Sequence, residues 1–420
     1  MRRYFFAALT ILLTLLAASA QDPSATRYDR LDCSGTLRPY PNPERRVATP
    51  DSLTPVFINH VGRHGARFPS SDKNTLELQR ALLKADSLGT ITPEGRQLLK
   101  LTNGVISQCT GRWGALDSLG MAEQRAIASR MYQTFPNLFA GGRVDALSSY
   151  VPRCVMSMYE FTHQLMRLNN KVEIYTSAGR QNNPLMRPWE NDRAFQAYLK
   201  GKVWETPYND YMAATLSATP IKRVLGENYP LTKPDALKLT MAEYFVIAGF
   251  PSMGRMVDSA PFFSPEEYNA CWSVFNLKHY LERSANTLST EPADVASKLL
   301  LDIIDTTDDA VSGRADITVA LRFGHAETIL PLISLMRLRG GYYMTNYFDT
   351  VGLHWRDFDL SPMAANLQLI LFKNKSGKYY VRLDLNERPI PILPNDDRLY
   401  LPWGEARDYF IRCLPLIDQP

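Results

Sequence analysis

Cysteine is scarce in this sequence, and its few copies exclude one class of fold. The 420 residues contain five, at positions 33, 109, 154, 271 and 413. Because five is odd, at least one thiol is unpaired, and the spacing matches no metal-binding pattern and fixes no disulfide connectivity. The chain is therefore not a disulfide scaffold, and its cysteines give no sign of a metal site.

Long apolar runs are also lacking, except at the N-terminus. Arg2 and Arg3 precede an apolar stretch over residues 4–18, and small residues follow at 18–20. The stretch is too short for a stable membrane anchor, and the pattern is typical of a secretory signal peptide at 1–20, with Gln21 as the first mature residue. We therefore expect an exported protein, periplasmic or secreted, with no membrane span.

The chain has no strong excess of charge of either sign. Its formal net charge is +4, which falls to +2 without Arg2 and Arg3. This balance gives no case for nucleic-acid binding, and a polyanionic ligand would need a local basic pocket. Hydrophobic residues make up 45% of the chain and aromatic residues 11%, which are values typical of a globular protein. A chain of this length usually forms two domains, or one domain with a large insertion.

Predicted strands and helices alternate on both sides of a region that lacks a strand pattern. Strands are expected at 54–60, 145–150, 172–179 and 316–323, and a hairpin at 365–385 that turns at 374–377. Helices are expected at 71–88, 119–135, from Pro152 onward, 292–307 and 327–338. We predict an α/β fold, an open mixed sheet flanked by helices, with an inserted, mostly α-helical cap. The expected core spans 21–180 and 296–420, and the cap spans 181–295.

Unusual polar residues follow three of the predicted strands. They are Arg63, His64 and Arg67 after the first strand, Arg153 after the second, and His325 and Glu327 after the strand at 316–323. The carboxyl ends of parallel strands meet at one edge of an open α/β sheet, where ligands bind. If these strands are parallel, all six side chains share one pocket.

This set of side chains fits the chemistry of phosphate transfer. Arginine forks match phosphate oxygens with paired, charge-assisted hydrogen bonds. One imidazole can attack phosphorus while the other donates a hydrogen bond to the phosphoryl group. Glu327 can protonate the leaving oxygen and then activate water, and we expect a bound dianion to raise the pKa of its carboxyl.

Two motifs resemble a known family. Residues 63–69, RHGARFP, match the RHGxRxP signature of the histidine acid phosphatases. Residues 324–328, GHAET, carry His-Ala-Glu where most of those enzymes carry His-Asp, and this resembles the multiple inositol polyphosphate phosphatases. The segments "RCVMS" at 153–157, "GHAETILPLISLM" at 324–336 and "NLQLILFKNKSGKYYVRLDLNERP" at 366–389 extend the resemblance.

The resemblance implies a role for each residue. His64 would be the nucleophile that becomes phosphohistidine, and Glu327 would be the proton donor. The phosphate would be held by Arg63, Arg67, Arg153 and His325. The family uses no metal or other cofactor, and the implied substrates are phytate and lower inositol phosphates; some members also act on 2,3-bisphosphoglycerate.

Two other functions stay open. One is a broad-specificity histidine acid phosphatase with no preference for inositol phosphates. The other is a non-catalytic binding protein for phosphorylated ligands, which the histidine pair and Glu327 disfavour because a binder needs neither nucleophile nor acid. A zinc deaminase would need a Pro-Cys-x-x-Cys motif after the His-x-Glu, and the chain has none.

Other titratable residues are expected to have structural roles. We predict helix-surface or capping roles for His60, Glu77, Glu94 and Glu123, and structural roles for His163, His279 and His354. Cys154 is expected to be a small buried apolar residue. Four basic residues that would suit a polyanion pocket stay unassigned: Arg112, Arg180, Arg187 and Lys202.

Overall fold

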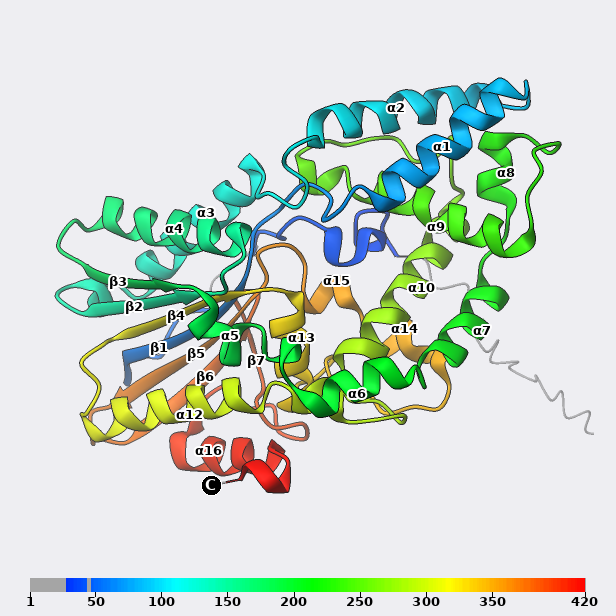
Figure 1. The fold of residues 1–420 in the computed structure, drawn as a ribbon. Coiled ribbons are helices and arrows are strands. Elements are labelled where there is room, and N and C mark those ends of the chain that lie inside the picture. Colours follow the sequence, from blue (N-terminus) through cyan, green and yellow to red (C-terminus); the bar gives the residue numbers. More distant parts are fainter. Residues whose placement is uncertain (1–27, 44–46, 420) are drawn as a thin grey trace, which may run out of the picture.

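A single eight-stranded sheet organises the molecule (Figure 1). The computed structural model describes residues 28–43 and 47–419. The main path of the sheet has the order β3-β2-β4-β1-β5-β6-β7, and β8 pairs with β6. The strands are β1 (Leu53–Arg63), β2 (Arg143–Ser148), β3 (Glu173–Ala178), β4 (Val319–Gly324), β5 (Asn366–Asn374), β6 (Tyr379–Leu385), β7 (Arg388–Ile390) and β8 (Leu401–Pro402).

The strand directions divide the sheet into two halves. Strands β3, β2, β4 and β1 are parallel, whereas β5 runs antiparallel to β1 and continues into the predicted hairpin with β6. The mixed sheet and the parallel pairing required for a shared pocket are therefore confirmed. Arg63 pairs with Gly324, and Ser148 pairs with Phe323, so the three strands end at the same edge.

Helices connect the strands and cover the sheet. They are α1 (Lys73–Ser87), α2 (Pro93–Cys109), α3 (Ser118–Thr134), α4 (Pro152–Leu168), α5 (Asn183–Met186), α6 (Arg193–Gly201), α7 (Glu205–Thr215), α8 (Thr219–Leu225), α9 (Lys233–Ala248), α10 (Pro265–Arg283), α11 (Glu291–Asp294), α12 (Ser297–Ser312), α13 (Ala326–Leu335), α14 (Val351–His354), α15 (Asp357–Leu360) and α16 (Trp403–Cys413). Figure 1 shows α3 and α4 on one face of the sheet and α12 and α16 on the other.

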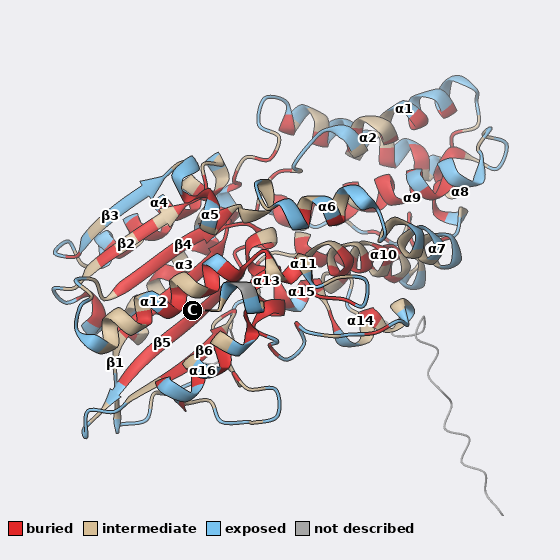
Figure 2. Cartoon of the chain, turned by 60° about the horizontal axis from the view of Figure 1, so that its bottom comes forward, coloured by how far each residue is buried: buried red, intermediate tan, exposed pale blue. Residues whose placement is uncertain are grey.

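Alternating side chains of the strands bury both faces of the sheet, as period-two geometry requires. In β1, Ile58 packs with α3 and α4, whereas Phe57 and Val61 pack with α12 and α13. Figure 2 shows that β4, β1 and β5 are buried, whereas edge strand β3 is largely exposed. The central strands β1 and β4 are thus held rigidly where they carry the candidate residues.

A second hydrophobic core lies in the helical part of the molecule. It joins α1 and α2 to α8, α9 and α10, with Leu82, Leu98 and Tyr244 among its fully buried residues. The fold class predicted from the sequence, α/β with a helical cap, is confirmed. The borders 21–180, 181–295 and 296–420 stay a prediction, and α1 and α2, from the first of these segments, pack with helices of the second.

Several predicted elements differ in their bounds from the observed ones. Helix α2 was not predicted, although Thr92 caps it and Pro93 opens it. The helix expected at 292–307 is split into α11 and α12. The signal peptide expected at 1–20 lies outside the described residues. Within the described ranges, no helix is long and apolar enough to cross a membrane.

Candidate active site

Three loops meet where β1, β2 and β4 end. The backbone N–H of His64 donates to the carbonyl of Gly324 at 3.0 Å, and the N–H of Ser149 donates to that of Phe323 at 3.0 Å. The backbone therefore joins the loop after β1 to the end of β4, and the loop after β2 to the same strand. Residues from positions 63 to 327 are brought to one edge in this way.

His64 is buried and has one ring nitrogen already engaged. Its side chain is 2% exposed, and Nδ1 lies 2.9 Å from the carbonyl oxygen of Gly65. Because a carbonyl oxygen only accepts, Nδ1 carries the proton and Nε2 keeps its lone pair. Burial lowers the pKa of His64 well below its ordinary value, and Arg63 and Arg153 lower it further. The imidazole is therefore neutral, which a nucleophile requires.

Buried side chains hold the loop that carries His64. The carboxylate of Glu123 accepts the N–H of Ala66 at 2.7 Å and that of Tyr40 at 2.8 Å. Ser157 accepts the N–H of Gly65 at 3.1 Å. Glu123 is 8% exposed, and burial raises its pKa to about 7. The helix-surface or capping role predicted for Glu123 is wrong, because its carboxylate holds the loop of the RHGARFP motif at 63–69 (the signature loop) from inside.

His60 is a second correction. It lies in the middle of β1, 1% exposed, with its ring 5.2 Å from that of Phe161 and 5.4 Å from that of Phe323. Burial lowers its pKa to about 3. The residue is therefore a neutral core histidine of the sheet, not a helix-surface or capping group.

Three arginines form the cationic part of the site: Arg63 is buried, and Arg67 and Arg153 are half-buried. Arg63 donates to the carbonyl oxygens of Thr36 and Ser361 at 2.7 and 2.6 Å, and Arg67 donates to that of Phe68 at 2.9 Å. Burial lowers the pKa of Arg63 to about 10 and that of Arg67 to about 9. The Nε atoms of both arginines and of Arg153 have no hydrogen-bond partner in the described part of the chain.

These arginines are also unpaired as charges. None of the three forms an ion pair with a carboxylate of residues 28–43 or 47–419. Positive charge that is buried or half-buried without a carboxylate partner is costly, so the arrangement favours an anion in the pocket.

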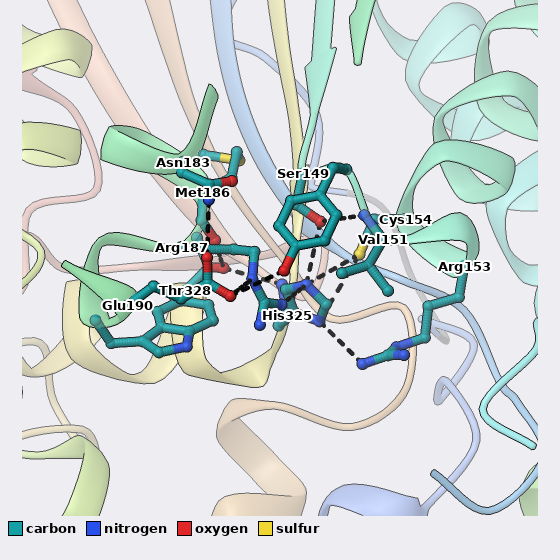
Figure 3. A network of polar contacts seen from close by, with 12 residues as sticks. Ser149, Val151, Arg153, Cys154, Asn183, Met186, Arg187, Glu190, His325 and Thr328 are labelled. Carbon is teal, nitrogen blue, oxygen red and sulfur yellow. Dashed lines mark hydrogen bonds and ion pairs between the residues drawn. The ribbon is translucent and has the colours of Figure 1, made fainter. Parts of the chain in front are cut away.

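His325 lies beside His64 at the N-terminus of α13. Its ring is 5.6 Å from that of His64 between centroids, at an interplanar angle of 76°. The backbone N–H of His325 donates to Thr328 Oγ1 at 2.9 Å, which fixes the start of the helix. Burial lowers the pKa of His325 to about 3, so this imidazole is neutral as well. Figure 3 shows its ring between Arg187 and Arg153.

Glu327 lies in the first turn of α13 with 40% of its side chain exposed. Burial alone would raise its pKa, but Arg283, His325 and Arg63 outweigh this effect and hold the pKa below its ordinary value. Arg283 Nη2 is 4.0 Å from Glu327 Oε1. We expected a bound dianion to raise the pKa of Glu327. In the protein chain alone, the neighbouring cations lower this pKa instead.

Arg187 is the functional candidate that sequence reasoning left unassigned. Its Nη1 lies 2.7 Å from Nε2 of His325, and Ser149 Oγ lies 3.1 Å from the same nitrogen. Arg187 follows the four-residue helix α5, in a segment with no recognisable strand or motif. Only the i,i+3 spacing of Arg187 and Glu190, which form an ion pair at 2.8 Å, was visible in the sequence.

The chain matches a family pattern over most of its length: the histidine phosphatase superfamily (branch 2), at residues 56–386. "Multiple inositol polyphosphate phosphatase 1" of Homo sapiens is 24% identical, over 87% of this chain and 81% of that protein. The protein of the same name from Gallus gallus is 26% identical, over 86% of this chain and 82% of that protein.

Solved structures have the same fold. The multiple inositol polyphosphate phosphatase of Bifidobacterium longum, in complex with inositol hexasulfate, aligns with a TM-score of 0.77 and 18% identity, covering 90% of this chain and 97% of that one. The phytase from D. castellii aligns with a TM-score of 0.70 and 15% identity, covering 92% and 86%. The match to the family pattern, supported by this fold, shows that the chain belongs to the histidine phosphatase superfamily (branch 2).

Proposed function

We propose that this protein removes phosphate groups from inositol polyphosphates such as phytate through a phosphohistidine intermediate. The proposal rests on the contacts and charges around His64. Its Nδ1 is engaged by Gly65, its Nε2 has no hydrogen-bond partner among residues 28–43 and 47–419, and three arginines without carboxylate partners there lie around it. A neutral nucleophile inside a cationic pocket fits an anionic phosphate ester.

In the first step, Nε2 of His64 attacks phosphorus and the bond between phosphorus and the inositol oxygen breaks. Arg63, Arg67 and Arg153 neutralise charge on the phosphoryl oxygens, where most of the catalytic stabilisation in phosphoryl transfer arises. Glu327 donates a proton to the departing oxygen. A bound dianion offsets the cations that hold the pKa of Glu327 down, so substrate binding itself raises that pKa toward the value of a working acid.

In the second step, water attacks the phosphohistidine. The Glu327 carboxylate takes a proton from this water, the P–N bond breaks, and inorganic phosphate leaves with His64 neutral again. The proton taken from water replaces the one given to the inositol oxygen, so the cycle closes without any other reactant.

The substrate class rests on the relatives and on charge. The human and chicken relatives are named as inositol polyphosphate phosphatases, and the three arginines without carboxylate partners favour a polyanion. The test is a comparison of kcat/KM for phytate with that for simple phosphomonoesters at equal ionic strength. A clear preference for phytate is expected; equal values would instead identify a broad-specificity acid phosphatase.

Trapping the intermediate tests the chemistry directly. Enzyme mixed with ³²P-phytate and quenched within milliseconds in alkaline denaturant should carry label on one histidine, because the P–N bond survives in base. The label should be absent from His64→Ala. A labelled residue other than His64, or unlabelled wild-type enzyme that still turns over, would contradict the proposal.

We also infer that the protein is exported, from the signal-peptide pattern of residues 1–20. N-terminal sequencing of the protein from the periplasm or medium should start at Gln21. Mature protein that still carries Arg2 and Arg3 would rule out this cleavage.

A further inference from the structure

His325 has an arginine on each side, and this limits its protonation state. Arg187 Nη1 lies 2.7 Å from Nε2, and Arg153 Nη2 lies 3.4 Å from Nδ1. Arginine only donates, whereas a neutral imidazole has one accepting nitrogen and one N–H. Both arginine contacts cannot therefore be hydrogen bonds at the same time.

The shorter contact identifies the accepting nitrogen. Nε2 of His325 also lies 3.1 Å from Ser149 Oγ, whose hydroxyl can turn to donate. A proton on Nε2 would point at the guanidinium of Arg187 at 2.7 Å, which is repulsive. Nε2 is therefore the acceptor and Nδ1 carries the proton. Burial, which lowers the pKa of His325 to about 3, supports a neutral ring.

Arg187 is itself held on several sides (Figure 3). Its Nε donates to Glu190 Oε1 at 2.8 Å, and its guanidinium lies over the rings of Trp189 and Tyr150 at 5.1 and 5.4 Å. Glu190 also accepts the hydroxyl of Tyr150 at 3.0 Å and the amide of Asn183 at 2.8 Å. With three donors on one carboxylate, Glu190 fixes the position from which Arg187 reaches His325.

We propose that Arg187, fixed in place by Glu190, is a positioning residue that holds His325 as the Nδ1–H tautomer. The inference rests on the proposed function for its catalytic meaning. Nδ1–H of His325 and Nη2 of Arg153 then face each other as two donors. Among the described residues, Nδ1 has one further polar contact, with Cys154 Sγ at 3.8 Å, which is a weak acceptor. A phosphoryl oxygen satisfies both donors, so the Glu190–Arg187 pair directs the imidazole proton toward the substrate phosphate.

The tautomer can be measured directly. The chain has six histidines, so ¹⁵N-histidine labelling of the whole protein gives a simple spectrum in which His325→Asn identifies the resonances of His325. We expect a protonated Nδ1 and an unprotonated Nε2 at every pH from 5 to 7.5. A protonated Nε2 in the wild-type protein would overturn the proposal.

Variants test what sets the tautomer. In Arg187→Gln and Glu190→Gln, we expect His325 to populate both tautomers and to titrate closer to its ordinary pKa of 6.5. Arg187→Lys keeps a donor and should largely retain the Nδ1–H form. The matched control is Glu205→Gln, which breaks an exposed i,i+3 pair with Lys202 and should leave His325 unchanged.

Kinetic measurements distinguish a positioning role of Arg187 from direct contact between Arg187 and the substrate. At metal sites, loss of a residue that orients a ligating histidine typically costs about 10- to 100-fold. We expect a similar fall in kcat for phytate in Glu190→Gln, with little change in KM and a new acidic limb in the pH profile. A rise in KM alone, with kcat and the tautomer unchanged, would show that Arg187 acts only by touching substrate and would refute the proposal.

The NMR and kinetic results distinguish the two hypotheses. If the wild-type protein hydrolyses neither phytate nor simple monoesters but shows the Nδ1–H tautomer, the proposed function fails and the assignment of His325 stands. If it is active and the Glu190 and Arg187 variants keep the wild-type tautomer and pH profile, the positioning role fails alone. Should Arg187→Gln not fold, as judged by circular dichroism, the Arg187→Lys and Glu190→Gln spectra decide the question.

Discussion

At the residue scale, the site consists of two buried, neutral imidazoles among arginines that are buried or half-buried. His64 and His325 both have a lowered pKa because they are buried, and nearby arginines add to this effect. One imidazole has its Nδ1 engaged by a carbonyl, and the other has its Nε2 engaged by an arginine. Each therefore presents one defined nitrogen, a lone pair on His64 and an N–H on His325, as an attacking group and a donor would need.

The first prediction concerns the proposed nucleophile. His64→Ala should lower kcat for phytate by at least about a thousandfold, since loss of a covalent catalyst usually costs this much or more. Phosphate binding should persist, because Arg63, Arg67 and Arg153 remain. Stopped assays of phosphate release and calorimetric titration with inorganic phosphate measure the two effects. Substantial residual turnover would rule out His64 as the nucleophile.

The second prediction concerns the proposed acid. Glu327→Gln should slow hydrolysis of phytate far more than that of p-nitrophenyl phosphate, whose leaving group scarcely needs a proton. We expect the ratio of the two kcat values to change by about 10- to 100-fold. Equal losses on both substrates would argue against proton donation by Glu327 and for a role in charge balance with Arg283.

Strand patterns were enough to place three candidate residues at one edge of the sheet. Each of His64, Arg153 and His325 follows a β-strand pattern closely, and strand ends are positions at which parallel sheets collect side chains. Arg187, Ser149 and Glu123 could not be found in the same way. They reach the site through tertiary packing alone, and no local pattern distinguishes Glu123 from an ordinary helix residue.

At the element scale, two glycines allow α3 to approach the signature loop. A Cβ on Gly65 would lie 2.4 Å from the carbonyl oxygen of Gly120, and one on Gly120 would lie 2.2 Å from that of Ala66. Both contacts are with backbone, which cannot move aside as a flexible side chain can. The loop that carries His64 therefore packs directly on the first turn of α3.

The third prediction follows from this contact. Gly65→Ala and Gly120→Ala should each destabilise the protein by about 1–3 kcal/mol, as overpacking does, and should lower kcat because the loop must shift. Gly104→Ala, at an exposed position in α2 with no neighbouring atoms in the way, is the control and should be neutral or stabilising. Chemical denaturation with parallel assays measures both effects. Normal stability in Gly65→Ala would mean that the contact is loose.

Helix α9 contains a buried acid that the site does not use. Glu243 is fully buried, and neither carboxyl oxygen has a hydrogen-bond partner among the described residues. Burial raises its pKa well above the ordinary value, so the folded protein holds a proton that the unfolded chain releases at neutral pH. This stabilising effect is present below pH 4.5 and is lost as the pH rises.

The fourth prediction concerns this acid. Glu243→Met, of similar volume, should stabilise the protein by about 1–3 kcal/mol at pH 8, with a smaller gain at pH 5. The control Glu227→Met replaces a carboxylate that is 78% exposed and should change little. Thermal unfolding at the two pH values measures the difference. A gain that does not depend on pH would show that ionisation of Glu243 is not the cause.

The helices also show where local patterns failed. The sequence of α2 has a cap at Thr92 and a proline at its first position, but Gly95 and Gly104 weaken its helical character. The buried face of α2 is explained by its partners, α1 and α8. Helix α1 precedes α2 in the chain, but α8 (Thr219–Leu225) comes from a distant segment, and the pattern of α2 alone could not indicate it.

At the scale of the whole molecule, buried histidines link stability to pH. His60, His64 and His325 are neutral in the folded protein because burial lowers their pKa. The unfolded chain binds protons on the same side chains below pH 6.5. Stability is therefore complete above pH 6.5 and is lost as the pH falls toward 3.

The fifth prediction follows from this linkage. The free energy of unfolding should fall between pH 6.5 and pH 4 by about 1.4 kcal/mol per pH unit for each imidazole that titrates. His60→Leu, in the middle of β1, removes one titrating imidazole and should reduce this slope by about 1.4 kcal/mol per pH unit. Urea denaturation at a series of pH values measures the slope. A slope that is the same in His60→Leu would contradict the pKa assigned to His60.

The order of the strands has a consequence for how the protein is made. Strand β1 ends at residue 63, and its parallel neighbour β4 ends at residue 324, after the whole helical region has been synthesised. A nascent chain that still lacks β4 holds the proposed nucleophile but neither the second imidazole nor the proposed acid. Hydrolytic activity should therefore emerge only late in folding, so an unfinished or truncated chain leaves cellular phosphate esters untouched.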